Sequence, residues 1–115
     1  MRTITIDGIT KPILDEISIR YNVESIEVTE NNEIYVEIFD KEILSAKPHC
    51  VCNAKKILEQ TQYNIGISVM YCVDVLQKRL LDLGINLDGR CYVYIARVIQ
   101  EFLRQLKKEK MQGIG

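Results

Sequence analysis

The sequence holds only one histidine, two prolines and six scattered glycines, and these scarcities exclude several kinds of protein. A catalytic cysteine needs a base, and the only histidine is His49. It adjoins Cys50 in the sequence, where two side chains rarely point at each other. Gly66, Gly84 and Gly89 are isolated, so neither a glycine-rich phosphate loop nor a dinucleotide fingerprint is present. We therefore expect a protein that is not an enzyme and that holds no cofactor.

Long apolar runs are also missing from the chain. Asp74, Lys78 and Arg79 interrupt the longest candidate, which therefore falls short of the roughly 20 residues that cross a bilayer. Residues 1–7 lack the apolar stretch that is typical of a signal peptide. We expect a cytoplasmic protein without membrane contact, whose four cysteines are reduced thiols rather than disulfides.

Charged residues are plentiful, and the two signs are separated along the chain. Residues 1–45 carry ten acidic and four basic side chains, a net charge of −6, whereas residues 46–115 carry six acidic and eleven basic ones, a net charge of +5. With 115 residues, 47% of them hydrophobic, the chain is expected to be one globular domain, 1–115, with an acidic strand-rich head and a basic helical part. The mixed charge argues against general nucleic-acid binding and for a localised basic face.

The acidic head is predicted to form a small sheet. Three segments alternate apolar and polar side chains and predict antiparallel strands: residues 2–7, 25–29 and 33–40. A turn at 30–32 joins the last two into a hairpin. Residues 10–21 favour a short helix, since Pro12 suits its first turn, and a strand over 17–21 is the alternative.

The basic part is predicted to be helical. Asn53 is an expected cap for a helix over 54–62, and Asn64 to Gly66 is an expected break. Two seams with helical spacing follow: Val69, Val73, Leu76, Leu80 and Leu83, then Tyr92, Ile95, Ile99, Phe102 and Leu106. Gly84 is expected to end the first helix and Asp88 to cap the second. The prediction is an α+β fold, in which about three strands and a short helix precede a long C-terminal antiparallel helical hairpin.

The stretch Pro-His-Cys-Val-Cys-Asn, residues 48–53, raises the question of a metal site. Zinc sites usually begin with two cysteines separated by two to four residues, whereas Cys50 and Cys52 are separated by one. With His49, Cys72 and Cys91 they remain weak metal candidates, and we expect no bound metal. We interpret the stretch as a lead into a helix.

Three arginines form the most specific pattern in the sequence. Arg90, Arg97 and Arg104 follow at seven-residue steps on one predicted helix face, with Tyr94 among them. Guanidinium groups suit bidentate contact with phosphate or carboxylate, and a tyrosine ring can stack on a base. A plain solvated face is the competing interpretation, since Glu101 divides the row. The pattern favours a non-catalytic, homo-oligomeric protein that captures an anionic, nucleotide-like small molecule or an acidic protein surface.

The alternative function is a protein–protein interaction module, such as an inhibitor or adaptor of the kind that mobile elements carry. It would use the acidic face of the hairpin, with Tyr35, Glu37 and Phe39 as contacts. Self-association into a homodimer or a larger assembly is expected with either function. The reason is a set of apolar residues outside the two seams: Val75, Leu81, Val93, Val98 and Leu103.

Overall fold

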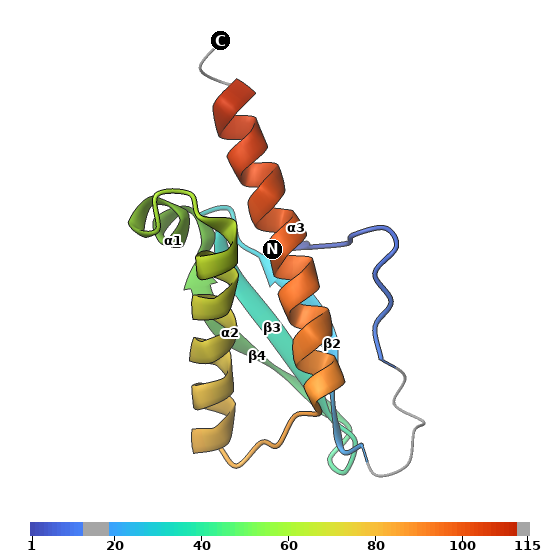
Figure 1. The fold of residues 1–115 in the computed structure, drawn as a ribbon. Coiled ribbons are helices and arrows are strands. Elements are labelled where there is room, and N and C mark those ends of the chain that lie inside the picture. The colour runs from blue at the N-terminus through green and yellow to red at the C-terminus, as the bar shows by residue number, and fades with distance from the viewer. Residues whose placement is uncertain (13–18, 113–115) are drawn as a thin grey trace.

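The computed structural model describes residues 1–12 and 19–112 and has an α+β architecture, as predicted. Four strands form one antiparallel sheet in the order β1-β2-β3-β4: Arg2–Thr3, Tyr21–Val28, Glu33–Asp40 and Ser45–Asn53. Three helices follow: α1 (Ala54–Gln60), α2 (Ile65–Asp82) and α3 (Gly89–Gln112). In Figure 1 the two long helices lie side by side in front of the sheet, and α3 extends beyond it.

The hairpin of β2 and β3 follows the predicted alternation. Ile26 pairs with Val36 and Val28 with Ile34, and all four side chains are buried on the same face of the sheet. Asn32 has a φ of 65° in the turn between the strands, a conformation that asparagine tolerates better than most residues. The hairpin prediction is therefore confirmed.

Strand β4 is the element that the sequence did not predict. It pairs with β3 along its whole length, from Glu33 with Asn53 to Asp40 with Ser45. It is also an edge strand, so alternate N–H groups along it have no partner in the sheet. Pro48 is therefore tolerated, because proline has no N–H to pair. Residues 48–53 are thus strand rather than a simple lead, although Asn53 does cap α1 by accepting a hydrogen bond from the Lys56 amide at 3.1 Å.

The N-terminal segment pairs with the sheet only briefly. Strand β1 contains two residues instead of the predicted six, and the Ile4 amide adds one more hydrogen bond, to the carbonyl of Ile26 at 2.7 Å. Of the helix predicted over 10–21, residues 13–18 lie outside the described residues, and Tyr21 already belongs to β2. The sheet therefore has four strands, because β4 adds to the predicted three.

The predicted caps are observed at the helix boundaries, although α1 ends at Gln60 rather than at the predicted residue 62. The side chain of Asn64 caps α2 by accepting a hydrogen bond from the Ile67 amide at 3.0 Å. The break predicted over Asn64 to Gly66 is therefore shorter than expected, because Ile65 and Gly66 already belong to α2. Gly84 follows α2 with a φ of 75°, the left-handed conformation that glycine adopts most readily. Asp88 caps α3 through the Arg90 amide at 2.8 Å.

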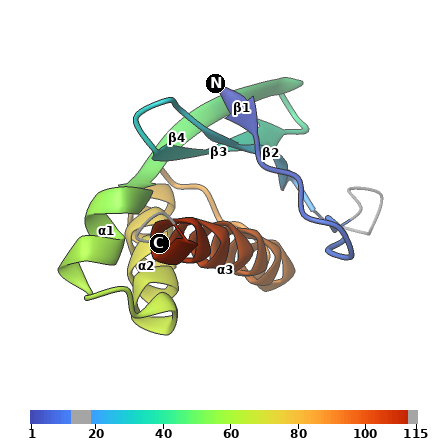
Figure 2. The ribbon, with the colours of Figure 1, turned by 90° about the horizontal axis from the view of Figure 1, so that it is seen from above.

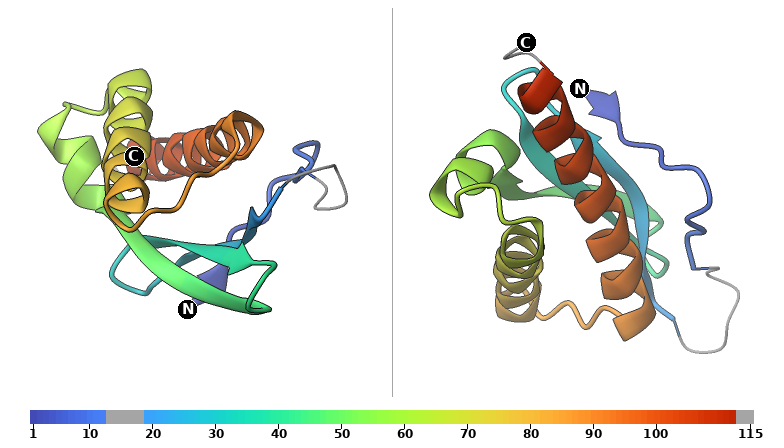
Figure 3. Two further views of the ribbon diagram at one scale, coloured as in Figure 1. Left: turned by 90° about the horizontal axis from the view of Figure 1, so that it is seen from below. Right: turned by 45° about the horizontal axis from the view of Figure 1, so that its top comes forward.

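Both long helices pack on one face of the sheet, α2 against β4 and α3 against β2, and against each other (Figures 2 and 3). The seam residues Leu76, Leu80, Ile95 and Ile99 are fully buried between them. Because α3 contacts both α2 and the sheet, its buried face is wider than one seam. Two residues expected outside the seams therefore lie in the core: Val98 and Leu103.

Candidate binding surfaces

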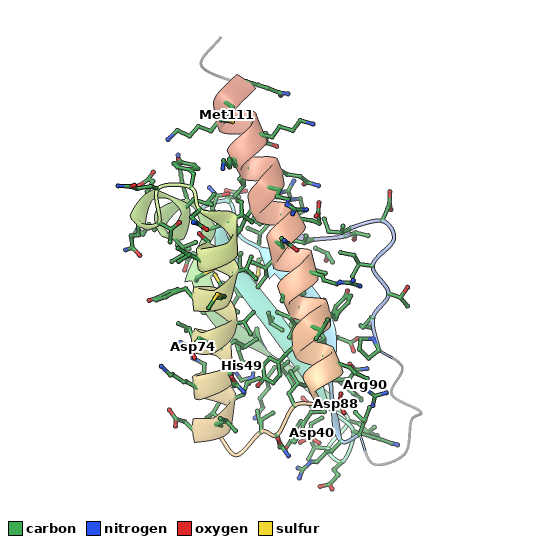
Figure 4. The ribbon with its side chains drawn as sticks, in the orientation of Figure 1. Asp40, His49, Asp74, Asp88, Arg90 and Met111 are labelled. Carbon is green, nitrogen blue, oxygen red and sulfur yellow. The ribbon has the colours of Figure 1, made fainter. Side chains whose placement is uncertain are left out.

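The predicted arginine row lies on the exposed side of α3. Arg90 Nε is 3.0 Å from Asp88 Oδ1, near the start of the helix (Figure 4), and Arg104 Nη1 is 2.7 Å from Glu101 Oε1. Arg97 is exposed and forms no ion pair with any residue of 1–12 or 19–112. Exposed ion pairs are worth about 0–1 kcal/mol. An anion could displace both carboxylates at small cost, but two of the three arginines already have one nearby.

Tyr94, the fourth predicted ligand residue, lies to one side of this row. Its ring is half-buried and packs against the hydrophobic core, and burial raises the pKa of its hydroxyl. A stacking platform for a base needs an open ring face. The structure thus brings the three guanidinium groups onto one helix face and places Tyr94 between that face and the core.

The second predicted surface is the sheet face opposite the helices. Strand β3 contributes four side chains to it: Glu33, Tyr35, Glu37 and Phe39. Strand β2 adds Ser25 and Glu27, and β4 adds the cross-strand neighbours Ala46, Pro48 and Cys50. We call this set the outer sheet face. No lysine or arginine of β2, β3 or β4 alternates onto it, and Figure 2 shows all three helices on the other side.

Hydrogen bonding gathers the carboxylates of the outer sheet face. Ser25 Oγ lies 3.1 Å from Glu37 Oε2 and 3.3 Å from Glu27 Oε1, so two carboxylates share one hydroxyl donor. The neighbouring Cys50 and Glu33 raise the pKa of Tyr35 above its ordinary value, and its hydroxyl is a neutral donor. The face therefore offers several unused acceptor oxygens beside two aromatic rings.

A small cavity that the sequence did not predict lies at one end of the sheet. It has a volume of about 260 Å³, and its polar lining comes from β2, β3 and β4: Tyr21, Asp40, Ser45, Lys47 and His49. His49 Nε2 is buried without a hydrogen-bond partner in the described part of the chain. Burial, followed by the positive charges of Arg79 and Lys47, lowers the pKa of His49. Ser45 and His49 are four residues apart on one strand, about 13 Å, so they form no nucleophile–base pair.

The weak metal candidates are spread over several places. Cys50 is on the outer sheet face, whereas Cys52 faces the helices and hydrogen-bonds to Cys72, which raises the pKa of the Cys52 thiol. Cys91 is buried at the start of α3, and His49 lines the cavity described above. Within residues 1–12 and 19–112, no three histidine, cysteine or carboxylate side chains are grouped so as to hold a metal ion.

The outward side of α2 carries an additional surface. A row of side chains steps along it by four, three, four and three residues: Ile67, Tyr71, Asp74, Lys78 and Leu81. We call this set the outer α2 row. Its three apolar members are 55%, 52% and 58% exposed. A groove of about 610 Å³ runs beside it, formed by α2 and Ala96 of α3. Leu81 lies outside the predicted seam. The regular spacing of the whole row is the sequence signal that identifies this surface.

Comparison with known proteins does not indicate what these surfaces bind. No protein-family model matches the chain, and neither the curated proteins nor the solved structures include a match to it. Within the described ranges, no helix is both long enough and apolar enough to span a membrane. The surfaces themselves are therefore the basis for inferring function.

Proposed function

We propose that this chain is a non-catalytic protein-binding module whose partner docks on the outer sheet face. The observation that carries the proposal is a sheet face with two aromatic rings among carboxylates, which no helix of the described chain covers (Figure 3). Tyrosine and other large aromatic side chains supply much of the binding energy at protein interfaces. Tyr35 and Phe39 lie four residues apart on the central part of that face and would be the anchors.

Stability alone does not account for the grouping of acids on this face. Glu27 and Glu37 converge on the one hydroxyl of Ser25, and no cation of the three strands lies among them. Carboxylates held close together repel each other and lower the stability of a sheet. A positively charged partner would remove this repulsion, which supports a binding role for the cluster.

The chemistry of the face defines the kind of partner. Complementary charge speeds association and rejects partners of the same sign, while apolar anchors slow dissociation. We therefore expect a protein segment in which lysine or arginine flanks an apolar or aromatic side chain. The Tyr35 hydroxyl, as a neutral donor, would add one directional contact.

Anion capture by the arginine row is the second candidate. It is favoured by Arg97, an exposed guanidinium that no carboxylate of the described residues neutralises, one helical heptad from both Arg90 and Arg104. It ranks lower because those two arginines already contact carboxylates and because Tyr94 packs against the core.

A peptide-display selection on the immobilised full chain tests the proposal. We expect the selected peptides to be rich in lysine and arginine around an aromatic or aliphatic residue. Their affinity should fall roughly a hundredfold in Glu27→Lys/Glu37→Lys, since like-charge contacts at an interface cost several kcal/mol. The matched control is Glu59→Lys/Glu109→Lys, which makes the same charge change at exposed helix positions.

The outcomes separate the two candidates. Peptides that bind the control variant Glu59→Lys/Glu109→Lys but not the sheet variant Glu27→Lys/Glu37→Lys would support docking on the outer sheet face. Acidic peptides, or nucleotides that raise the melting temperature of the native chain but not of Arg97→Ala, would favour the arginine row instead. Basic peptides that bind the sheet variant as tightly as the native chain would contradict the proposal.

A further inference from the structure

We infer that the outer α2 row is a symmetric interface, on which a second copy of this chain packs its own α2 antiparallel to the first. The row is distinct from the outer sheet face, because α2 lies on the opposite side of the sheet from that face (Figure 2). The inference therefore concerns a second surface and does not depend on the proposed function.

The exposed apolar residues of α2 supply the first argument. Ile67, Tyr71 and Leu81 are each more than half exposed, and Met70 beside them is 72% exposed. Ile67, Met70 and Tyr71 form one apolar patch near the start of α2, and exposed apolar patches of this kind mark interaction sites. The groove that follows the row has further apolar lining from Val69, Val73 and Ala96, and its volume of about 610 Å³ gives room for side chains of a second molecule.

The order of charges in the row supplies the second argument and identifies the occupant. Asp74 and Lys78 are one helical turn apart at the middle of α2 (Figure 4 labels Asp74). In an antiparallel pair with its two-fold axis at the level of Leu76, Asp74 of each copy faces Lys78 of the other. The same register places Tyr71 of each copy against Leu81 of the other, so an apolar contact flanks each ion pair.

Other registers lose this complementarity. An axis at Asp74 would set two aspartates against each other, and an axis at Lys78 would set two lysines against each other. The row is thus complementary to a reversed copy of itself in one register. An unrelated partner would need the same charges in the same order by coincidence, whereas a second copy of this chain has them by construction.

The charged groups of Asp74 and Lys78 can change partners without a change in the backbone of α2. Asp74 Oδ2 and Lys78 Nζ are 3.0 Å apart within one helix, and their side chains are 58% and 74% exposed. Rotation about side-chain bonds can turn both charged groups toward a facing helix while the backbone of α2 stays in place. The dimer would then stack α2 and α3 of both copies into a four-helix layer, with the two sheets on its outer sides.

Charge exchange tests the interface and its register together. Sedimentation equilibrium of the full native chain should show a dimer. Asp74→Lys and Lys78→Asp should each weaken it at least roughly tenfold, because each variant creates two like-charge contacts. An equimolar mixture of the two variants should dimerise at least as well as the native chain, since every cross-copy contact is then between opposite charges.

The control pair is Glu59→Lys and Lys55→Asp, which alters an exposed acid and base at the same spacing on α1. These variants should dimerise like the native chain, and circular dichroism should show equal helix content in all of them. A native chain that stays monomeric at about 100 μM, or a dimer that the exchanged charges at 74 and 78 leave unchanged, would overturn the inference. So would a mixture that fails to recover the dimer.

Discussion

The two faces of the sheet are built from the same strands, yet they differ in composition and in burial. The inner face is aliphatic, and Ile34 and Val36 are fully buried under the helices. The outer face alternates aromatic rings with carboxylates, and Tyr35 and Glu37 are only half-buried. Burying an aliphatic side chain contributes about 1.5–3 kcal/mol, whereas grouped carboxylates repel each other and lower the stability of the sheet. The inner face therefore specifies the fold, whereas packing places few demands on the residues of the outer face.

The largest expected effect on stability comes from truncating two neighbouring residues of β3, one on each face of the sheet. Ile34→Ala should lower the free energy of unfolding by about 2–5 kcal/mol, because it leaves a cavity in the core. Tyr35→Ala, the next residue along β3, removes a larger side chain but should cost only about 1 kcal/mol, since it leaves no cavity. Urea unfolding of both variants measures the difference. Equal losses would mean that the outer face belongs to the folding core.

A smaller effect should come from His49, a polar residue on the inner side of β4. Burial lowers its pKa below the ordinary value of 6.5, so the unfolded chain takes up the proton at a higher pH than the folded chain does. Its contribution to stability is therefore complete above about pH 6.5 and is lost as the pH falls toward the pKa of the folded state.

The pH effect can be isolated by substitution. Between about pH 7.5 and about pH 5.5 the melting temperature of the native chain should fall more than that of His49→Gln, which has no proton to gain. The groups that face the ring, Tyr21 and Asp40 from the sheet, Lys47 on its own strand and Arg79 from α2, stay the same in both proteins. Parallel curves for the two proteins would show that the buried imidazole does not control this dependence.

Local patterns made much of the fold predictable. The alternation of β3 gave its bounds, and the caps at Asn53, Asp88 and Gly84 are all where the sequence places them. Strand β4 was not predictable, because Lys47, Pro48 and His49 lack strand propensity. It forms since β3 needs a partner along its second edge, which is a non-local requirement.

The candidate surfaces were predictable only as far as each lies on one element. The outer sheet face follows from alternation along β3, and the arginine row from helical spacing along α3. The packing of Tyr94 against the core and the cavity around His49 depend on contacts between distant segments. The outer α2 row could have been found from its spacing. Its exposure depends on which side of α2 packs into the core, and local spacing does not determine that.

The most direct test of the division between the two sheet faces is an amide NMR titration of the native chain with a selected basic peptide. We expect the shifted amide signals to cluster in β2, β3 and β4, around Ser25, Glu37 and Cys50, while the amide signals of α3 near Arg97 do not shift. The same titration of Phe39→Ser should show no binding, although this variant should melt close to the native temperature. Shifts concentrated on α3, with unchanged signals from the sheet, would contradict docking on the outer sheet face.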